Sequence, residues 1–110
     1  MIGARAVLAG LLLGLGGGWA SSAIAQEPDG ATLYKQKTCI ACHGPDAKTP
    51  ILPEYPKLAG QSAAYMLQQM KDIKSGARNN GNTAAMAGIM FLVNEEEMQV
   101  LAGYLEQLSP

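Results

Sequence analysis

The chain has 110 residues, of which 48% are hydrophobic and 15% are charged, and its formal net charge is -1 at pH 7. This length allows one domain rather than several. A slightly acidic chain lacks the excess of basic residues that binds phosphate backbones, so nucleic acid is excluded as a partner.

Residues 1–25 are predicted to be a secretory signal peptide. Arg5 supplies the positive start, residues 6–18 form an apolar run, and residues 23–25 are a small-x-small cleavage site. Cleavage near Ala25-Gln26 would leave a periplasmic domain of residues 26–110. The alternative is an uncleaved anchor, but a membrane-spanning helix needs about 20 continuous apolar residues, and here glycines and serines interrupt the run. We expect no stable membrane insertion after cleavage.

A short helix from Ala31 to Lys37 is the first predicted element of this domain. It follows Asp29-Gly30, and Leu33 and Tyr34 form its apolar side. The pentapeptide Cys39-Ile40-Ala41-Cys42-His43 stands at its end.

This pentapeptide has the spacing of a c-type haem attachment site. Its two thiols can reach the two vinyl groups at one edge of a porphyrin while the next side chain reaches the iron. We therefore predict one haem c, with Cys39 and Cys42 forming thioethers and His43 as the proximal iron ligand. These are the only two cysteines and the only histidine of the chain, so no second site of this kind is available.

Two other chemistries use paired cysteines, and both are disfavoured here. A redox-active dithiol belongs on a βαβ scaffold, and runs of Val, Ile and Thr long enough for strands are missing. A structural zinc needs four ligands, usually Cys and His, whereas this chain offers three such side chains within one turn.

The size and charge of the predicted mature domain also matter. Removing 25 residues from 110 leaves 85, close to the ~70–80 below which a single core seldom suffices, so we expect the haem-free chain to fold poorly. Basic residues gather between Gln61 and Asn79, and only acidic ones follow Asn80. This distribution predicts one basic face and one acidic face.

The rest of the chain predicts two longer helices separated by irregular segments. Four prolines within residues 44–60 exclude a continuous helix and predict an ordered loop. Ser62 can cap a helix that runs to Ser75 and ends at Gly76. Residues 79–82 form a turn, and a loop is expected from there through Val93. The apolar stripe of the helix that Ser62 caps consists of Met66, Met70 and Ile73, with Leu67 alongside.

Asn94 is predicted to cap the last helix, whose first turn carries Glu95, Glu96 and Glu97. Carboxylates at this end suit the helix dipole. The buried side of this helix should consist of Leu101, Tyr104, Leu105 and Leu108.

The chain resembles class I c-type cytochromes, most closely the small bacterial periplasmic ones, over essentially all of Gly30 to Leu108, and three stretches support the resemblance. One is the haem motif with the preceding Gly30-Ala31-Thr32-Leu33-Tyr34, which is similar to the family's first helix. The others are Tyr55-Pro56-Lys57-Leu58-Ala59-Gly60-Gln61, like the family's Pro-x-Leu-x-Gly-Gln stretch, and Leu101-Ala102-Gly103-Tyr104-Leu105, like its C-terminal helix. The resemblance implies an all-α cytochrome c fold, in which a few short helices wrap one covalently bound haem.

The resemblance also implies a methionine as the iron ligand opposite His43. Met86 is preferred because it stands eighteen residues before Tyr104, close to the family's separation, whereas Met90 would shorten that distance by four. Met90 remains the alternative, since Ala87-Gly88 replaces the proline that often follows the ligand in related chains. Core packing is the default role of the methionines on predicted helices, Met66, Met70 and Met98.

Further roles follow from the same resemblance and from the physics of metal ligands. The backbone carbonyl of Pro56 is the candidate to accept the remaining ring proton of His43. Arg78 is the candidate cation for a haem propionate, and the amides of Asn79, Asn80 and Asn82 are alternatives. A solvated turn accounts for these polar residues equally well, and ordinary surface positions account for Lys35 and Lys37.

A haem with both axial positions filled has no vacant site for a substrate, so we expect a single-electron carrier rather than an enzyme. Its partners would be redox proteins of the periplasm, which donate and accept electrons in brief encounters. The alternative is a haem-bearing subunit docked permanently on a periplasmic oxidoreductase. A gas binder or enzyme with a labile sixth ligand is a third hypothesis.

Overall fold

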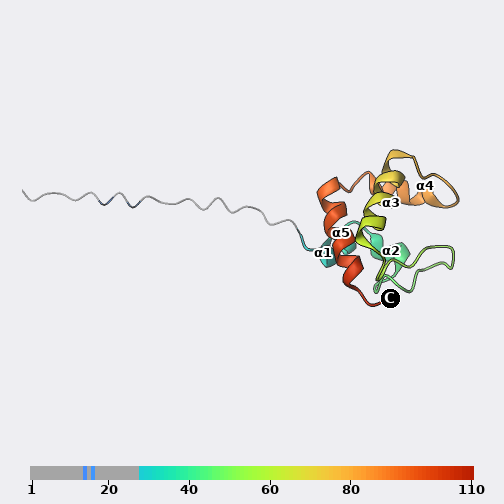
Figure 1. Cartoon of the computed structure of the whole chain (residues 1–110), viewed down its shortest axis with the longest axis horizontal. Coiled ribbons are helices and arrows are strands. Elements are labelled where there is room, and N and C mark those ends of the chain that lie inside the picture. The colour runs from blue at the N-terminus through green and yellow to red at the C-terminus, as the bar shows by residue number, and fades with distance from the viewer. Residues whose placement is uncertain (1–13, 15, 17–27) are drawn as a thin grey trace, which may run out of the picture.

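The computed structural model describes residues 14, 16 and 28–110 of the chain. Within this part all regular structure is helical, which confirms the expected all-α class (Figure 1). Apart from Gly14 and Gly16, the predicted signal peptide of residues 1–25 lies outside the described residues. The helices are α1 (Gly30–Gln36), α2 (Cys39–His43), α3 (Ala63–Ser75), α4 (Thr83–Met90) and α5 (Glu95–Gln107).

The first helix begins at a side-chain cap. Asp29 Oδ1 accepts a hydrogen bond from the Thr32 amide at 2.8 Å, and this bond lowers the pKa of the Asp29 carboxyl. Leu33 and Tyr34 are buried, as the pattern predicted. The helix spans Gly30–Gln36, one residue ahead of the predicted range at each end.

The two long helices begin and end where their capping residues predict. Ser62 Oγ accepts from the Tyr65 amide at 3.3 Å at the start of α3, which ends at Gly76 in a left-handed conformation. Asn94 and Glu97 form a reciprocal capping box at the start of α5. The predicted stripe of α3 is buried at Met66, Met70 and Ile73. Of the predicted buried side of the last helix, Leu101 and Leu105 are buried, whereas Tyr104 and Leu108, the residue just after α5, are half-buried.

The loop expected to extend through Val93 is a misprediction, because Thr83–Met90 forms helix α4. This segment is rich in Ala and Met, which favour helix, but Gly88 lowers its propensity by about 1 kcal/mol and Asn82 makes no side-chain capping bond. Local signals therefore understate the helix. Met86 and Met90 consequently lie one helical turn apart.

Helix α5 packs against both α1 and α3, so that the two ends of the domain meet (Figure 1). The contact with α1 is close at Gly30, where a Cβ atom would overlap Cβ of Tyr104. The rings of Tyr34 and Tyr104 pack against each other, with their centroids 6.2 Å apart and their planes at 53°. Helix α4 packs against α3, and α2 against α1.

Tyr34 also ties α1 to the residue that ends α2. Its hydroxyl donates to the Gly44 carbonyl at 2.6 Å, in a buried position, and burial raises the pKa of this phenol. We expect Tyr34→Phe to lower the free energy of unfolding in urea by about 1–2 kcal/mol, because the buried carbonyl loses its partner. The control is Tyr65→Phe, at a side chain that is 53% exposed, with an expected change within about 0.5 kcal/mol. Equal effects of both variants would contradict this account.

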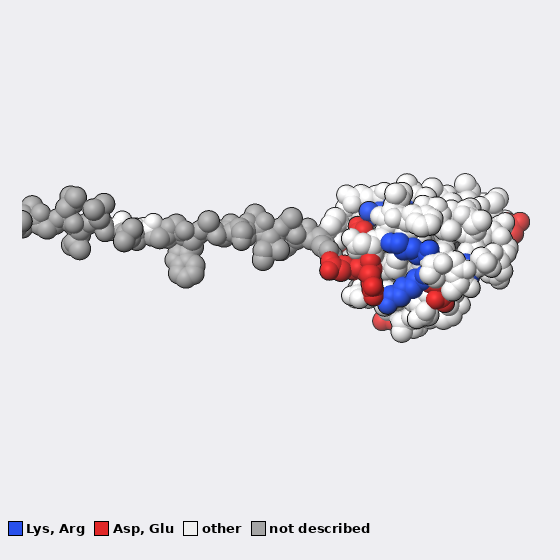
Figure 2. Space-filling model, turned by 90° about the horizontal axis from the view of Figure 1, so that it is seen from above, with Lys and Arg blue, Asp and Glu red and all other residues white. Residues whose placement is uncertain are grey.

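The sequence predicted one basic and one acidic face, but the charged residues do not divide in this way. Because α3 and α5 lie side by side, Lys71 pairs with Glu95 at 2.9 Å, and Lys37 of the first helical region pairs with Glu97 at 3.2 Å. Figure 2 shows basic and acidic side chains next to each other on one face. None of the helices among the described residues is long and apolar enough to cross a bilayer.

Candidate functional site

The single turn of α2 holds both cysteines and the histidine of the predicted haem motif. Thr38, in the left-handed region with φ 64°, separates this turn from α1. Cys39 is half-buried and Cys42 exposed, and no disulfide joins them. Burial raises the pKa of the Cys39 thiol, which the nearby Cys42 also raises. A redox-active thiol needs a lowered pKa, so this environment disfavours the dithiol interpretation.

His43 is oriented by the backbone of the following loop. Its Nδ1 lies 2.9 Å from the Pro56 carbonyl oxygen, and only 6% of the residue is exposed. Because a carbonyl can only accept, Nδ1 carries the proton of this bond. Burial lowers the pKa of His43, although the bond to Pro56 acts in the opposite direction. Burial therefore favours the neutral imidazole, whose Nε2 is free for a metal when Nδ1 carries the proton.

The loop of residues 44–60 is ordered by its own hydrogen bonds, as predicted. Gly44, with φ +85°, reverses the chain after His43, and a Cβ there would overlap the Thr49 carbonyl oxygen. The Asp46 carboxylate accepts from the amides of Lys48 and Thr49 at 3.0 and 2.9 Å, and these bonds contribute to a lowered pKa of Asp46. This framework holds Pro56 in place beside His43 without any regular secondary structure.

A cavity of about 440 Å³ lies beside α2 and is enclosed by all five helices and the loop. Its volume falls in the range of about 300–1,000 Å³ that is typical of cofactor and small-molecule sites. The wall is largely apolar, with Ile73, Ile89, Leu101 and Leu105 among its residues. Every predicted site residue lines this one cavity: Cys39, Cys42, His43, Pro56, Arg78 and Met86.

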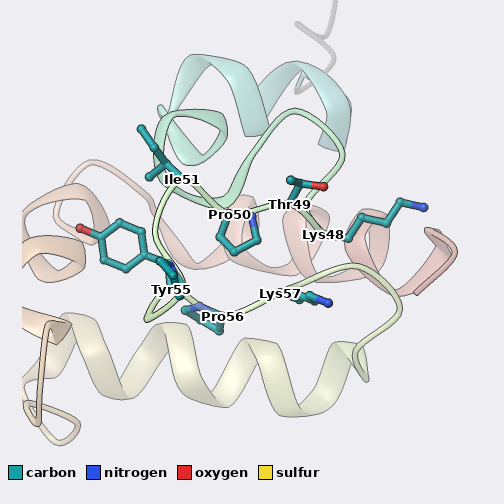
Figure 3. Close-up of a pocket in the computed structure, with 8 residues that line it drawn as sticks. Lys48, Thr49, Pro50, Ile51, Tyr55, Pro56 and Lys57 are labelled. Carbon is teal, nitrogen blue, oxygen red and sulfur yellow. The ribbon is translucent and has the colours of Figure 1, made fainter.

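A second and more open hollow of about 900 Å³ lies on the loop of residues 48–57. Figure 3 shows the apolar and aromatic side chains of Ile51 and Tyr55 on one side of this loop and those of Lys48 and Lys57 on the other. No cysteine, histidine or methionine lines this hollow. We therefore assign the chemistry to the smaller cavity, which shares the wall formed by Tyr55, Pro56 and Lys57.

Four methionines reach the cavity wall. Met86 is half-buried, whereas Met90 is only 2% exposed and belongs to the core, so the two candidates on α4 differ in their environment. Met66 and Met70 line the cavity while packing in the core of α3, as their stripe predicted. Met98 is buried in the core.

Arg78 lies at the cavity with a partner that sequence analysis missed. Its Nη1 donates to Gln69 Oε1 at 3.1 Å, and its amide donates to the Asp72 carbonyl at 3.0 Å. Gln69 stands three residues after Met66 on the cavity side of α3, and this helical spacing was the signal available in the sequence. Asn80 and Asn82 also line the cavity.

Comparison with known proteins agrees with this arrangement. The sequence model of the cytochrome c family, described as "Cytochrome c", matches residues 28–109. The chain belongs to the cytochrome c family. Membership of this family implies a covalently bound c-type haem and a role in electron transfer.

Individual cytochromes show the same relationship. Cytochrome c4 of Pseudomonas aeruginosa is 40% identical over 70 residues, which cover 64% of this chain and 33% of that protein. The thiosulfate dehydrogenase electron acceptor of Stutzerimonas stutzeri is 36% identical over 91 residues, 76% of this chain and 41% of that protein. The crystal structure of reduced cytochrome c4 from Pseudomonas stutzeri superposes with a TM-score of 0.65 at 31% identity, over 73% of this chain and 46% of that one.

These comparisons confirm the cytochrome c fold. This chain spans between a third and a half of the length of the cytochrome c4 proteins that it matches.

Proposed function

We propose that this chain is a single-electron carrier of the periplasm with one haem c, held between His43 and Met86. The observation that carries the proposal is the turn of Cys39, Cys42 and His43 opening onto one apolar cavity. His43 is already oriented there by the Pro56 carbonyl, 2.9 Å from its Nδ1.

The residues at this cavity fit a covalently bound haem. Two thiols stand at its edge, and an imidazole with a free Nε2 stands beside them. The apolar wall suits a porphyrin, and the guanidinium of Arg78 suits a propionate. Because the chain has two cysteines and one histidine, these residues support one haem and no more.

Met86 is the proposed second axial ligand. Both Met86 and Met90 line the cavity, but Met86 is half-buried whereas Met90 is packed into the core. The spacing of eighteen residues between Met86 and Tyr104 agrees with the family's pattern. Met90, one turn further along α4, is the alternative that the experiment below separates.

The chain's own residues account for the behaviour of such a carrier. When bound, the haem supplies an iron that exchanges one electron at a time, and a thioether ligand favours its ferrous state. Pro56 holds the ring of His43 in a fixed orientation, and the largely apolar wall would limit the access of water to the bound haem. With both axial positions taken by side chains, the protein binds no substrate at the metal and makes or breaks no bond.

The proposed partners are redox proteins of the same compartment. This proposal rests on the predicted signal peptide and on the name of a relative, a thiosulfate dehydrogenase electron acceptor. That relative also favours the second candidate function, a haem subunit bound permanently to a dehydrogenase. Exposed Ile51, Leu52, Phe91 and Leu92 would suit a lasting, apolar interface. Co-purification with a catalytic chain at a constant ratio in high salt would favour the subunit.

A redox titration with optical spectra tests the axial pair. We expect Met86→Ala to remove the near-infrared charge-transfer band of the ferric protein. Its reduction potential should fall by on the order of 100 mV, a fraction of the ~0.8 V that axial ligands span. Met90→Ala is the matched control on the same helix, and it should keep the band while losing about 2–4 kcal/mol of stability, because Met90 is buried. Loss of the band in Met90→Ala but not in Met86→Ala would show that Met90 is the ligand instead of Met86. Rapid binding of carbon monoxide by the ferrous wild type would contradict His and Met ligation altogether.

A further inference from the structure

Charged side chains of three helices converge on the turn that connects α4 to α5, residues 91–94. Lys37, which ends α1, donates from Nζ to the Leu92 carbonyl at 2.8 Å. Lys74 of α3 donates from Nζ to the Val93 carbonyl at 2.6 Å. Glu97 of α5 pairs with Lys37 at 3.2 Å. The α4–α5 turn is thereby tied to the end of α1 and to α3.

This tie matters because α4 packs against only one other described helix. Among the described helices, α4 packs against α3 and makes no comparable contact with α1, α2 or α5. Its first turn receives no side-chain capping bond from Asn82. The position of the helix relative to the rest of the domain therefore depends on its packing against α3 and on its carboxyl end.

Burial of side chains holds this turn at one residue only. Phe91 and Leu92 are 70% and 63% exposed, and only Val93 is fully buried. Carbonyls just beyond a helix end have no partner within the helix, and cations are favoured there by the helix dipole. The two lysines supply these partners from other helices, so they act as a clamp on the turn.

The clamp connects the two proposed iron ligands. Lys37 stands two residues before Cys39 and so adjoins the turn that carries His43. Leu92 stands six residues after Met86, at the end of the helix that carries it. A bond from Lys37 to Leu92 thus spans from the histidine side of the cavity to the methionine side.

We infer that Lys37 and Lys74 are positioning residues that hold the Met86 thioether at its bonding place opposite His43. This inference rests on the proposed function, since it presupposes that Met86 binds the iron. The lysines do not touch the metal site themselves. They limit how far α4 can swing away, and thereby how readily an external ligand replaces the thioether.

The test is imidazole binding to the ferric, haem-loaded protein, followed optically. Imidazole can bind only when the thioether leaves. A protein in which α4 is held less firmly should therefore bind imidazole more tightly. We expect Lys37→Met and Lys74→Met each to tighten imidazole binding about tenfold, as the loss of one charge-assisted bond in a partly exposed setting implies. Both variants keep the apolar stem of the side chain and remove its donor. Lys37→Arg and Lys74→Arg, which keep a cationic donor, should return the affinity toward that of the wild type.

Two controls separate the clamp from a general loss of surface charge. Lys71 stands one turn before Lys74 on α3 and pairs with Glu95 rather than with the turn, so Lys71→Met should change imidazole affinity less than twofold, as expected of an exposed pair. Glu97→Gln removes the ion pair of Lys37 but leaves its bond to Leu92, and it too should have a small effect.

The outcomes are distinct. Lys37→Met and Lys74→Met that bind imidazole no better than Lys71→Met would overturn the clamp, even if they unfold more easily. Absence of the near-infrared band from the wild type would instead overturn the proposed axial pair. Should Lys74→Met fail to load haem, Lys74→Gln takes its place in the imidazole titration. Hydrogen exchange of the α4 amides in Lys37→Met gives a second measurement: faster exchange than in the wild type supports the clamp, and unchanged exchange counts against it.

Discussion

A protein with Cys39→Ser and Cys42→Ser together is expected to carry no covalently attached haem and to lose most of its helical structure. Serine hydroxyls do not form the thioether bonds, although they fill nearly the same space. The cavity of about 440 Å³ would then lack the apolar body that its wall surrounds. A domain of this size buries too little surface to fold dependably without such a body.

Mass spectrometry and circular dichroism of protein matured in a host that attaches c-type haem measure both effects. The wild type should have the mass of the peptide plus one haem, and the double variant the mass of the peptide alone. The two single variants, each with one thiol left, are the controls, and they should retain a haem held by one thioether in reduced yield. A double variant with native helix content and no haem would show that the helices assemble around the cavity unaided.

Replacing Gly30 by Ala is expected to destabilise the protein by about 1–3 kcal/mol, the usual cost of overpacking. The added methyl would overlap Cβ of Tyr104 and would lie 3.2 Å from the Val100 carbonyl oxygen. These atoms belong to the α5 backbone or adjoin it, so they cannot move aside without separating α1 from α5. Alanine favours a helix over glycine by at most about 1 kcal/mol, which does not offset the clash.

Gly103→Ala on α5 is the matched control for this prediction. Gly103 also lies in a helix, but a methyl there would meet no atom within 4 Å. The same substitution should therefore stabilise the protein by about 0.5–1 kcal/mol through helix propensity alone. Guanidinium unfolding of both variants measures the difference. If Gly30→Ala were as stable as Gly103→Ala, the close approach of the two helices would not be a constraint on the fold.

Three of the five helices could be placed from sequence because their starting signals are local. Asp29, Ser62 and Asn94 each accept a bond from an amide three residues ahead, so the cap and the helix stand together in the chain. Helix α4 could not be placed in this way, because it has no side-chain cap. Its stability comes from packing on α3 and from lysines distant in sequence, to which a local pattern is blind.

The same division runs through the candidate site. Covalent haem attachment needs two thiols and an imidazole at a set spacing, and such chemistry is visible in five consecutive residues. The partner of His43 is a backbone carbonyl, a group that every residue carries, so nothing in the composition of the loop pointed to Pro56 apart from the family resemblance. The environment of Met86 and the contacts of Lys37 and Lys74 depend on how segments distant in the chain come to lie together. Short-range chemistry is written in neighbouring residues, whereas these arrangements arise only when the whole chain has packed.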